Sequence, residues 1–443
     1  MLALTSLALA AALAAADARD PRLARLTSAV DAARMKATVA KLVSFGTRHT
    51  LSDAESPTRG IGAARRWLLS QFSALAQQPG SRLRPFEDAF TQAPAPRIPR
   101  PVEIRNVGAV LPGTDLARAK EALVLTGHYD SRATDVMNAS ADAPGANDDG
   151  SGTALMLELA RVMAQERPAI SVYFVAVAGE EQGLNGSTHL AQRLQAEGVR
   201  VLAMTAVDMI GNSQGQDGVH DDASARLFSE GVPATESEAQ RKLRQALGGE
   251  NDGAAREWCR YVKRVGEREV EHLDLWLMLR RDRIARGSDH LAFSQAGFPA
   301  IRLVEGHEHW DRQHQDVRAV EGRRYGDLLE HVDFAYAAKL GRALLAAVTE
   351  LAAAPAPPRE VALGGAVGPD TRLHITLPAD DRVTGLILYR RRADGIAWQR
   401  AVRYPPQPEI VLKDVVPDNF SFAVATVDAD GRESLPVYPG RLE

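Results

Sequence analysis

Three short apolar segments constrain the fold of this chain more than any other feature. Residues 122–127, 170–178 and 201–207 are predominantly apolar, and helical patterns separate them. Strands that are buried on both faces lack polar alternation, so these segments predict a sheet with parallel strands and flanking helices. We therefore expect an α/β fold with a mixed, mostly parallel sheet, to which residues 102–110 and 300–304 add further strands.

Polar side chains follow each of the three segments. Parallel strands place their carboxyl ends at one edge of a sheet, where ligands bind. A turn rich in glycine and aspartate at 145–152 joins this edge to the helix that follows, and it contains Asp148. The residues at the strand ends are His128, Asp130, Glu180, Glu181 and Asp208.

The carboxylates among these residues require a compensating charge. Asp148, Glu181 and Asp208 would repel one another in a single volume at a cost of several kcal/mol. Two divalent cations remove that cost, and mixed histidine and carboxylate ligands favour zinc. We predict two zinc ions bound by His128, Asp148, Glu181 and Asp208, with Asp148 as the bridge between them.

A fifth ligand is expected among three downstream histidines, His307, His309 and His314. We select His314 because Asp316 follows it two residues later, as Asp130 follows His128. Residues i and i+2 of an extended segment point the same way, so each aspartate is expected to orient its imidazole. Glu180 is adjacent to a ligand but is not itself needed as a ligand, which favours a role as general base.

The ordered motifs resemble the M28 family of zinc peptidases, which includes secreted bacterial aminopeptidases. They are Gly-His-Tyr-Asp-Ser at 127–131, the turn at 145–152, Gly-Glu-Glu-Gln-Gly at 179–183 and Val-Asp-Met-Ile-Gly at 207–211. The resemblance covers about residues 35–350. It implies a phosphorylase/hydrolase-like core with two zinc ions bridged by a water and by Asp148.

The resemblance also implies roles for single residues. His128 and Asp208 would hold one zinc ion, Glu181 and His314 the other, and Glu180 would act as base. Ser-Asp-His at 288–290 resembles a family segment that is structural rather than ligating. Gln313 stands where many relatives have a tyrosine that stabilises the oxyanion, so no residue is assigned to that role.

The length of 443 residues predicts two folded units, and the N-terminal residues predict a leader. Residues 1–18 resemble a signal peptide, which implies a secreted or periplasmic protein. Residues 19–352 are predicted to form the peptidase domain, with a helical insertion at about 211–287. After a linker rich in alanine and proline, residues 359–443 alternate with a period of two, which predicts a β-sandwich. This part resembles fibronectin type III domains.

Several classes of partner are not expected. A formal net charge of -4 gives no reason to expect nucleic acid, and no segment has the roughly 20 apolar residues of a membrane span. A single cysteine, Cys259, excludes an internal disulfide, and we interpret it as a buried small hydrophobe.

The residues alone predict a two-metal hydrolase. The resemblance implies a zinc exopeptidase, first of all an aminopeptidase acting on peptides with a free N-terminus. Three alternatives stay open. A carboxypeptidase would need a cationic clamp for the substrate carboxylate, for which Arg280, Arg281, Arg283 and Arg286 are available. The others are a glutaminyl cyclase of the same fold and a binding protein with a peptidase-like shell.

Overall fold

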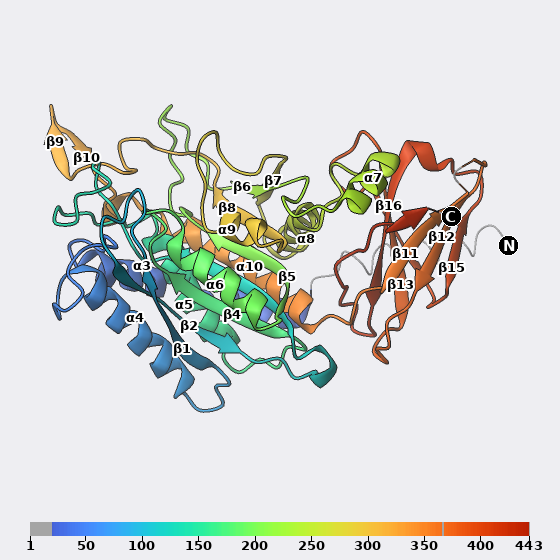
Figure 1. The fold of residues 1–443 in the computed structure, drawn as a ribbon, viewed down its shortest axis with the longest axis horizontal. Coiled ribbons are helices and arrows are strands. Elements are labelled where there is room, and N and C mark those ends of the chain that lie inside the picture. Colours follow the sequence, from blue (N-terminus) through green and yellow to red (C-terminus); the bar gives the residue numbers. More distant parts are fainter. Residues whose placement is uncertain (1–19, 366, 443) are drawn as a thin grey trace.

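The computed structural model describes residues 20–365 and 367–442, which form an α/β body and a smaller β domain (Figure 1). The signal peptide predicted for residues 1–18 lies outside the described residues. In the described part of the chain, no helix combines the length and apolar content that crossing a membrane requires.

A mixed sheet of eight strands forms the centre of the body, in the order β1-β2-β4-β3-β5-β8-β6-β7. The four central strands β4, β3, β5 and β8 are parallel to one another. Strand β2 is antiparallel to β4, and β6 is antiparallel to β8. The predicted mixed α/β sheet is therefore confirmed. The strands are β1 Arg84–Gln92, β2 Val102–Leu111, β3 Glu121–His128, β4 Ser171–Val177, β5 Arg200–Val207, β6 Ser224–Ser229, β7 Asp274–Met278 and β8 Ala300–Glu305.

Both faces of this sheet are covered by helices. Leu123 and Leu125 of β3 belong to one hydrophobic core and Val124 to the other, because successive side chains of a strand point to opposite faces. Helices α3, α4, α5, α8 and α10 cover the first face, and α6 and α9 the second. The helices are α2 Pro21–Ser28, α3 Ala32–Val43, α4 Gly60–Ala76, α5 Gly150–Met163, α6 Asn185–Ala196, α7 Glu238–Leu247, α8 Ala254–Glu269, α9 His290–Gln295 and α10 Phe334–Ala353.

The structure differs from the sequence prediction in two strand regions. Residues 211–287 were predicted as a helical insertion, but besides α7 and α8 they contribute β6 and β7 to the main sheet. The edge strand β1 was not predicted, because charged and polar residues interrupt its apolar positions. Short or edge strands bury too little surface to need a clear apolar pattern.

The C-terminal residues form two small sheets that pack face to face. One has the order β15-β12-β11-β17 and the other β14-β13-β16. Their facing side chains share a core that includes Leu373 and Phe422, so the predicted β-sandwich is present. The likeness to fibronectin type III domains stays a prediction. The strands are β11 Glu360–Gly364, β12 Thr371–Thr376, β13 Gly385–Arg392, β14 Arg400–Tyr404, β15 Glu409–Leu412, β16 Phe420–Val427 and β17 Arg441–Leu442. A separate hairpin, β9 Arg318–Val320 and β10 Arg323–Tyr325, belongs to the α/β body.

Helix α8 joins the two units because it is buried on two sides. Trp258 and Val262 pack into the core of the body. On the side of the β domain, Glu257 accepts hydrogen bonds from Trp398 Nε1 (3.0 Å) and from the Tyr438 hydroxyl (2.6 Å). The Glu257 carboxylate is therefore buried but paired.

Cys259 lies on the same helix and is buried, as predicted. Burial raises the pKa of its thiol to about 12. Such a thiol stays protonated and unreactive at neutral pH, which fits its interpretation as a small hydrophobe.

Candidate metal centre

The predicted ligands converge at the carboxyl edge of the central strands. His128 is the last residue of β3 and Asp208 directly follows β5. Two groups of side chains form there, and the ligand atoms of each group lie within 4.8 Å of one another. One group consists of His128, Glu180 and Asp208, and the other of Asp148, Glu181 and His314.

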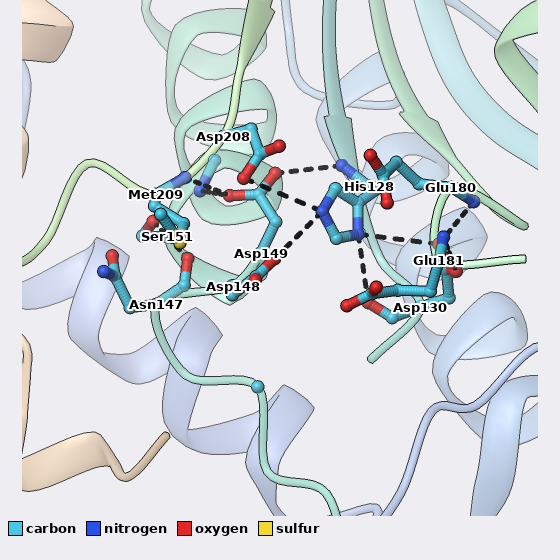
Figure 2. A network of polar contacts seen from close by, with 12 residues as sticks. His128, Asp130, Asn147, Asp148, Asp149, Ser151, Glu180, Glu181, Asp208 and Met209 are labelled. Atoms are coloured by element: carbon cyan, nitrogen blue, oxygen red, sulfur yellow. Dashed lines mark hydrogen bonds and ion pairs between the residues drawn. The ribbon is translucent and has the colours of Figure 1, made fainter. Parts of the chain in front are cut away.

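Asp148 lies between the two groups. Its Oδ1 is 3.1 Å from His128 Nε2, and its Oδ2 is 2.9 Å from His314 Nε2. The imidazole of His128 has Asp148 and Asp208 on one side and Asp130 on the other (Figure 2). One carboxylate therefore faces a histidine of each group, as the bridging role requires.

Among the three downstream histidines, the geometry favours His314. Its Nε2 is 3.3 Å from Glu181 Oε1. His307 instead lies 3.3 Å from Asp221, and His309 lines a small cavity behind Asp148. The expected partner of His314 was wrong, because the Asp316 carboxylate accepts the backbone N–H of Thr134 (3.1 Å).

Asp130 positions the neighbouring strand end more than it orients the imidazole. Its carboxylate accepts the backbone N–H groups of Glu181 (3.1 Å) and Glu180 (3.4 Å) and the Thr50 hydroxyl (3.1 Å). The atom closest to His128 Nδ1 is the backbone oxygen of Asp130 at 3.2 Å, whereas the carboxylate is 3.6 Å away. Asp130 thus fixes the loop that presents both glutamates.

Two further aspartates hold the backbone of the site. The Asp149 carboxylate accepts the N–H groups of His128 (2.9 Å) and Met209 (3.2 Å), so it ties the ends of β3 and β5 together. It also caps α5, and an aspartate directly before the predicted helix start was a usable signal for that role. The Asp327 carboxylate accepts the N–H groups of Asn147 (2.8 Å) and Asp148 (2.7 Å). No pattern in its loop marked Asp327.

A buried arginine neutralises one ligand. Arg302 on β8 is fully buried, and its Nη2 lies 3.0 Å from Asp208 Oδ2. Burial raises the pKa of Asp208, but the Arg302 guanidinium and the His128 imidazole together outweigh burial and hold that pKa below its usual range. The segment at 300–304 was interpreted only as an apolar strand, so this arginine was missed.

The remaining atoms of the site fit divalent cations. Among the described residues, His128 Nε2, Glu181 Oε1 and Asp208 Oδ1 are buried without a hydrogen-bond partner. Burial and the carboxylates of Glu181 and Asp208 raise the pKa of Glu180 well above its usual value. Buried carboxylates that face one another need a cation, and imidazole with carboxylate is a donor set suited to zinc.

The segment at 288–290 lies beside the ligands without joining either group. His290 Nε2 is 2.9 Å from the backbone oxygen of Arg281, and the ring is buried. Burial lowers the pKa of His290 to about 4. A neutral histidine held by a backbone carbonyl fits the predicted structural role.

Comparisons with known proteins bear on this site. The model of peptidase family M28 matches residues 106–332. A probable zinc metalloprotease of Leptosphaeria maculans is 40% identical over 95% of this chain and 97% of its own length. One of Pyrenophora teres f. teres is 41% identical over 95% of this chain and 87% of its own. These relatives are fungal, whereas the sequence motifs had pointed to the secreted bacterial members.

Solved structures share the fold at low identity. The Legionella pneumophila LapA aminopeptidase aligns with a TM-score of 0.52 and 19% identity, over 75% of this chain and 74% of its own. Legionella pneumophila LapB aligns with a TM-score of 0.51 and 20% identity, over 75% of each chain.

Proposed function

The chain belongs to peptidase family M28, and from this premise we propose that it is a zinc-dependent aminopeptidase that hydrolyses the N-terminal residue from peptides. The observation that carries the proposal is the position of Asp148 between two buried ligand groups. Paired ligand groups of this kind suit a two-metal hydrolase.

The residues would divide between two zinc ions. His128 and Asp208 would hold one, Glu181 and His314 the other, and Asp148 would contact both. Zinc bound there supplies a Lewis acid that polarises the scissile carbonyl and lowers the pKa of water.

Glu180 is proposed as the general base. It lies in the group of His128 and Asp208 without being needed as a ligand, and Asp130 holds its backbone. Its carboxylate takes a proton from water while the water oxygen forms a bond to the carbonyl carbon. It then gives that proton to the leaving nitrogen as the C–N bond breaks. The raised pKa of Glu180 is in the direction that a base working near neutral pH needs.

A structural neighbour supports cleavage at the amino end of a peptide. The Legionella pneumophila LapA structure, which shares the fold, is that of an aminopeptidase. The carboxylates of Asp148, Glu180, Glu181 and Asp208 do not decide between the two ends of a peptide, because two bound zinc ions would neutralise them. The substrate is proposed to be a peptide with a free N-terminus.

One observation favours a carboxypeptidase as the second candidate. The Arg286 guanidinium lies beside the second group, with Nη2 3.4 Å from His314 Nδ1. Arg283 lies 2.8 Å from Glu308 and Arg286 lies 3.5 Å from it, so Arg286 is the less tightly paired clamp for a substrate carboxylate. Guanidinium groups bind carboxylates in two-pronged geometry.

Three versions of one peptide separate these candidates. An aminopeptidase cleaves the free and the C-amidated forms but not the N-acetylated form. A carboxypeptidase cleaves the free and the N-acetylated forms but not the amidated one. Loss of ammonia from an N-terminal glutamine without chain shortening would indicate a glutaminyl cyclase.

A variant of Glu180 tests the mechanism. Glu180→Gln should lower kcat by about 10²–10⁴-fold while zinc content, measured by mass spectrometry, stays that of the wild type. Glu197→Gln, an exposed glutamate at the end of α6, is the matched control and should keep full activity. Full turnover by Glu180→Gln would reject the assigned base.

A further inference from the structure

Arg48 is a fully buried cation beside the metal centre, in the segment between α3 and α4. Burial lowers the pKa of Arg48 to about 10, so its guanidinium stays charged at neutral pH. The aspartates whose charges act on it are Asp327, Asp130, Asp149 and Asp148. One positive charge therefore lies among the aspartates of the site.

The guanidinium donates to backbone oxygens rather than to these carboxylates. Its Nε donates to the backbone oxygen of Tyr129 (2.7 Å) and its Nη2 to that of Gly145 (2.8 Å). Its Nη1 donates to the backbone oxygen of Pro144. All three nitrogens thus hold main chain, and the contacts of Arg48 fix the position of the backbone.

The backbone that Arg48 holds belongs to two segments that carry predicted ligands. Tyr129 directly follows His128, the last residue of β3. Gly145 begins the turn that carries Asp148, and its oxygen also accepts the first N–H group of α5 (3.0 Å), which closes this turn. Arg48 therefore joins the strand end at His128 to the turn of Asp148.

The position of Arg48 is fixed from both sides. A Cβ at Gly145 would lie 2.9 Å from Arg48 Nη2 and 2.5 Å from the Cβ of Ser131, so only glycine fits this close approach. The Ser131 hydroxyl accepts the backbone N–H of Arg48 (3.1 Å) and donates to the backbone oxygen of Ala143 (2.7 Å). The guanidinium therefore has little freedom to move away from the turn.

The charge of Arg48 and its hydrogen bonds have opposite effects on zinc affinity. A cation beside the ligand groups repels a divalent cation, so loss of the charge alone would strengthen zinc binding. Hydrogen bonds that hold ligand-bearing segments in place favour the metal, and their loss weakens binding. The sign of the change in zinc affinity therefore shows which effect dominates.

We propose that Arg48 is a positioning residue that holds Asp148 at the correct place between the two ligand groups. The planar guanidinium presents a rigid fork of donors that reaches both segments at once, whereas the ammonium of a lysine is a single point charge. This role rests on the proposed two-zinc centre, whichever end of a peptide is cleaved.

Zinc affinity, measured by competition with a chelator, tests this role in two variants. Arg48→Lys keeps the charge but loses the fork, and Arg48→Met loses both. Each should bind zinc about 10–100-fold more weakly than the wild type. Arg48→Lys keeps the proposal testable if Arg48→Met does not fold. Zinc affinity at or above the wild-type value in either variant would overturn the proposal.

Arg118→Met is the matched control, because Arg118 is also a buried arginine that donates to a backbone oxygen, that of Ala354 (2.8 Å). It pairs with Glu121 at the opposite end of β3 from His128. This variant should have a lower melting temperature but wild-type zinc affinity. An equal loss of zinc affinity in Arg118→Met would show that any buried arginine has this effect and would overturn the proposal. A wild type that binds zinc but cleaves no peptide would reject the proposed function alone.

Discussion

The metal centre and the interface of α8 with the β domain both bury charged side chains, but they compensate them differently. At the interface, Arg260 Nη1 is 3.4 Å from Glu257 and donates to the Tyr438 hydroxyl (2.7 Å). At the metal centre, Glu180 and Glu181 lie near other carboxylates, and several of the buried ligand atoms have no partner in the described chain.

This difference distinguishes a structural contact from a binding site. Buried charges that are paired within the chain need nothing further, and removing one partner leaves the other uncompensated. Buried charges of like sign are tolerated only where an ion from solution compensates them. Burial alone therefore does not indicate function, whereas several buried carboxylates that face one another indicate a site for a cation.

Removal of the metal should give the largest effect. Dialysis against a chelator is expected to lower activity by more than about 100-fold and to lower the melting temperature, because the carboxylates then repel one another. Added zinc should restore both. Activity and scanning calorimetry measure this, and a chelated protein with full activity would contradict the metal assignment.

Substitution of Glu257 should weaken the interface between α8 and the β domain without changing the metal centre. Glu257→Ala leaves Arg260 buried without its carboxylate and should lower the free energy of unfolding by about 3–5 kcal/mol. Urea unfolding measures this. Glu238→Gln, on the exposed surface of α7, is the control and should cost less than about 1 kcal/mol. Equal costs would show that the interface charges are not effectively buried.

The buried His290 should make stability depend on pH. Its folded pKa is lowered from 6.5 to about 4, so the unfolded chain takes up a proton first as the pH falls. The contribution of the neutral His290 to the free energy of unfolding is complete above pH 6.5. It is lost as the pH falls from 6.5 to about 4, where the loss approaches about 3 kcal/mol. Unfolding of metal-free protein at pH 7 and pH 4.5 measures it. His290→Gln should show a smaller difference between the two pH values, and an unchanged difference would assign the pH effect to other groups.

Substitution of Asp327 should give the smallest effect. Asp327→Asn keeps the shape but replaces one acceptor oxygen, so the Asp148 loop is held less firmly. Zinc affinity should fall by about 10–100-fold, measured by competition with a chelator. Asp316→Asn is the matched control and should keep its affinity, since Asp316 contacts Thr134 rather than a ligand. An equal loss of zinc affinity in both variants would show that Asp327 has no specific role in holding the Asp148 loop.

The fold and the first ligands could be predicted because they depend on local pattern. Apolar strands and the polar residues after them are adjacent in sequence, so His128, Glu181 and Asp208 could be placed at one edge. Strand β1 was missed because charged and polar residues interrupt its apolar positions, and β6 and β7 were missed because they are short.

The residues that support the site could not be predicted, because their partners are distant. Asp327 and Arg302 act on residues 179 and 94 positions away, respectively. For Asp316 the sequence predicted a contact that is absent. The spacing of two residues suggested that its carboxylate contacts His314, but the backbone turns at this point and the carboxylate binds Thr134 instead. His314 itself has a φ of 52°, so this segment is not extended as the spacing argument assumed.

The hold of Asp327 on the Asp148 loop also bears on when the peptidase becomes active during synthesis. A ribosome delivers His128 and Asp148 long before His314 and Asp327. A nascent chain that ends before residue 327 lacks the Asp327 carboxylate, so the loop that carries Asp148 is not yet held in place. We therefore expect zinc to bind only after nearly the whole α/β body has been made.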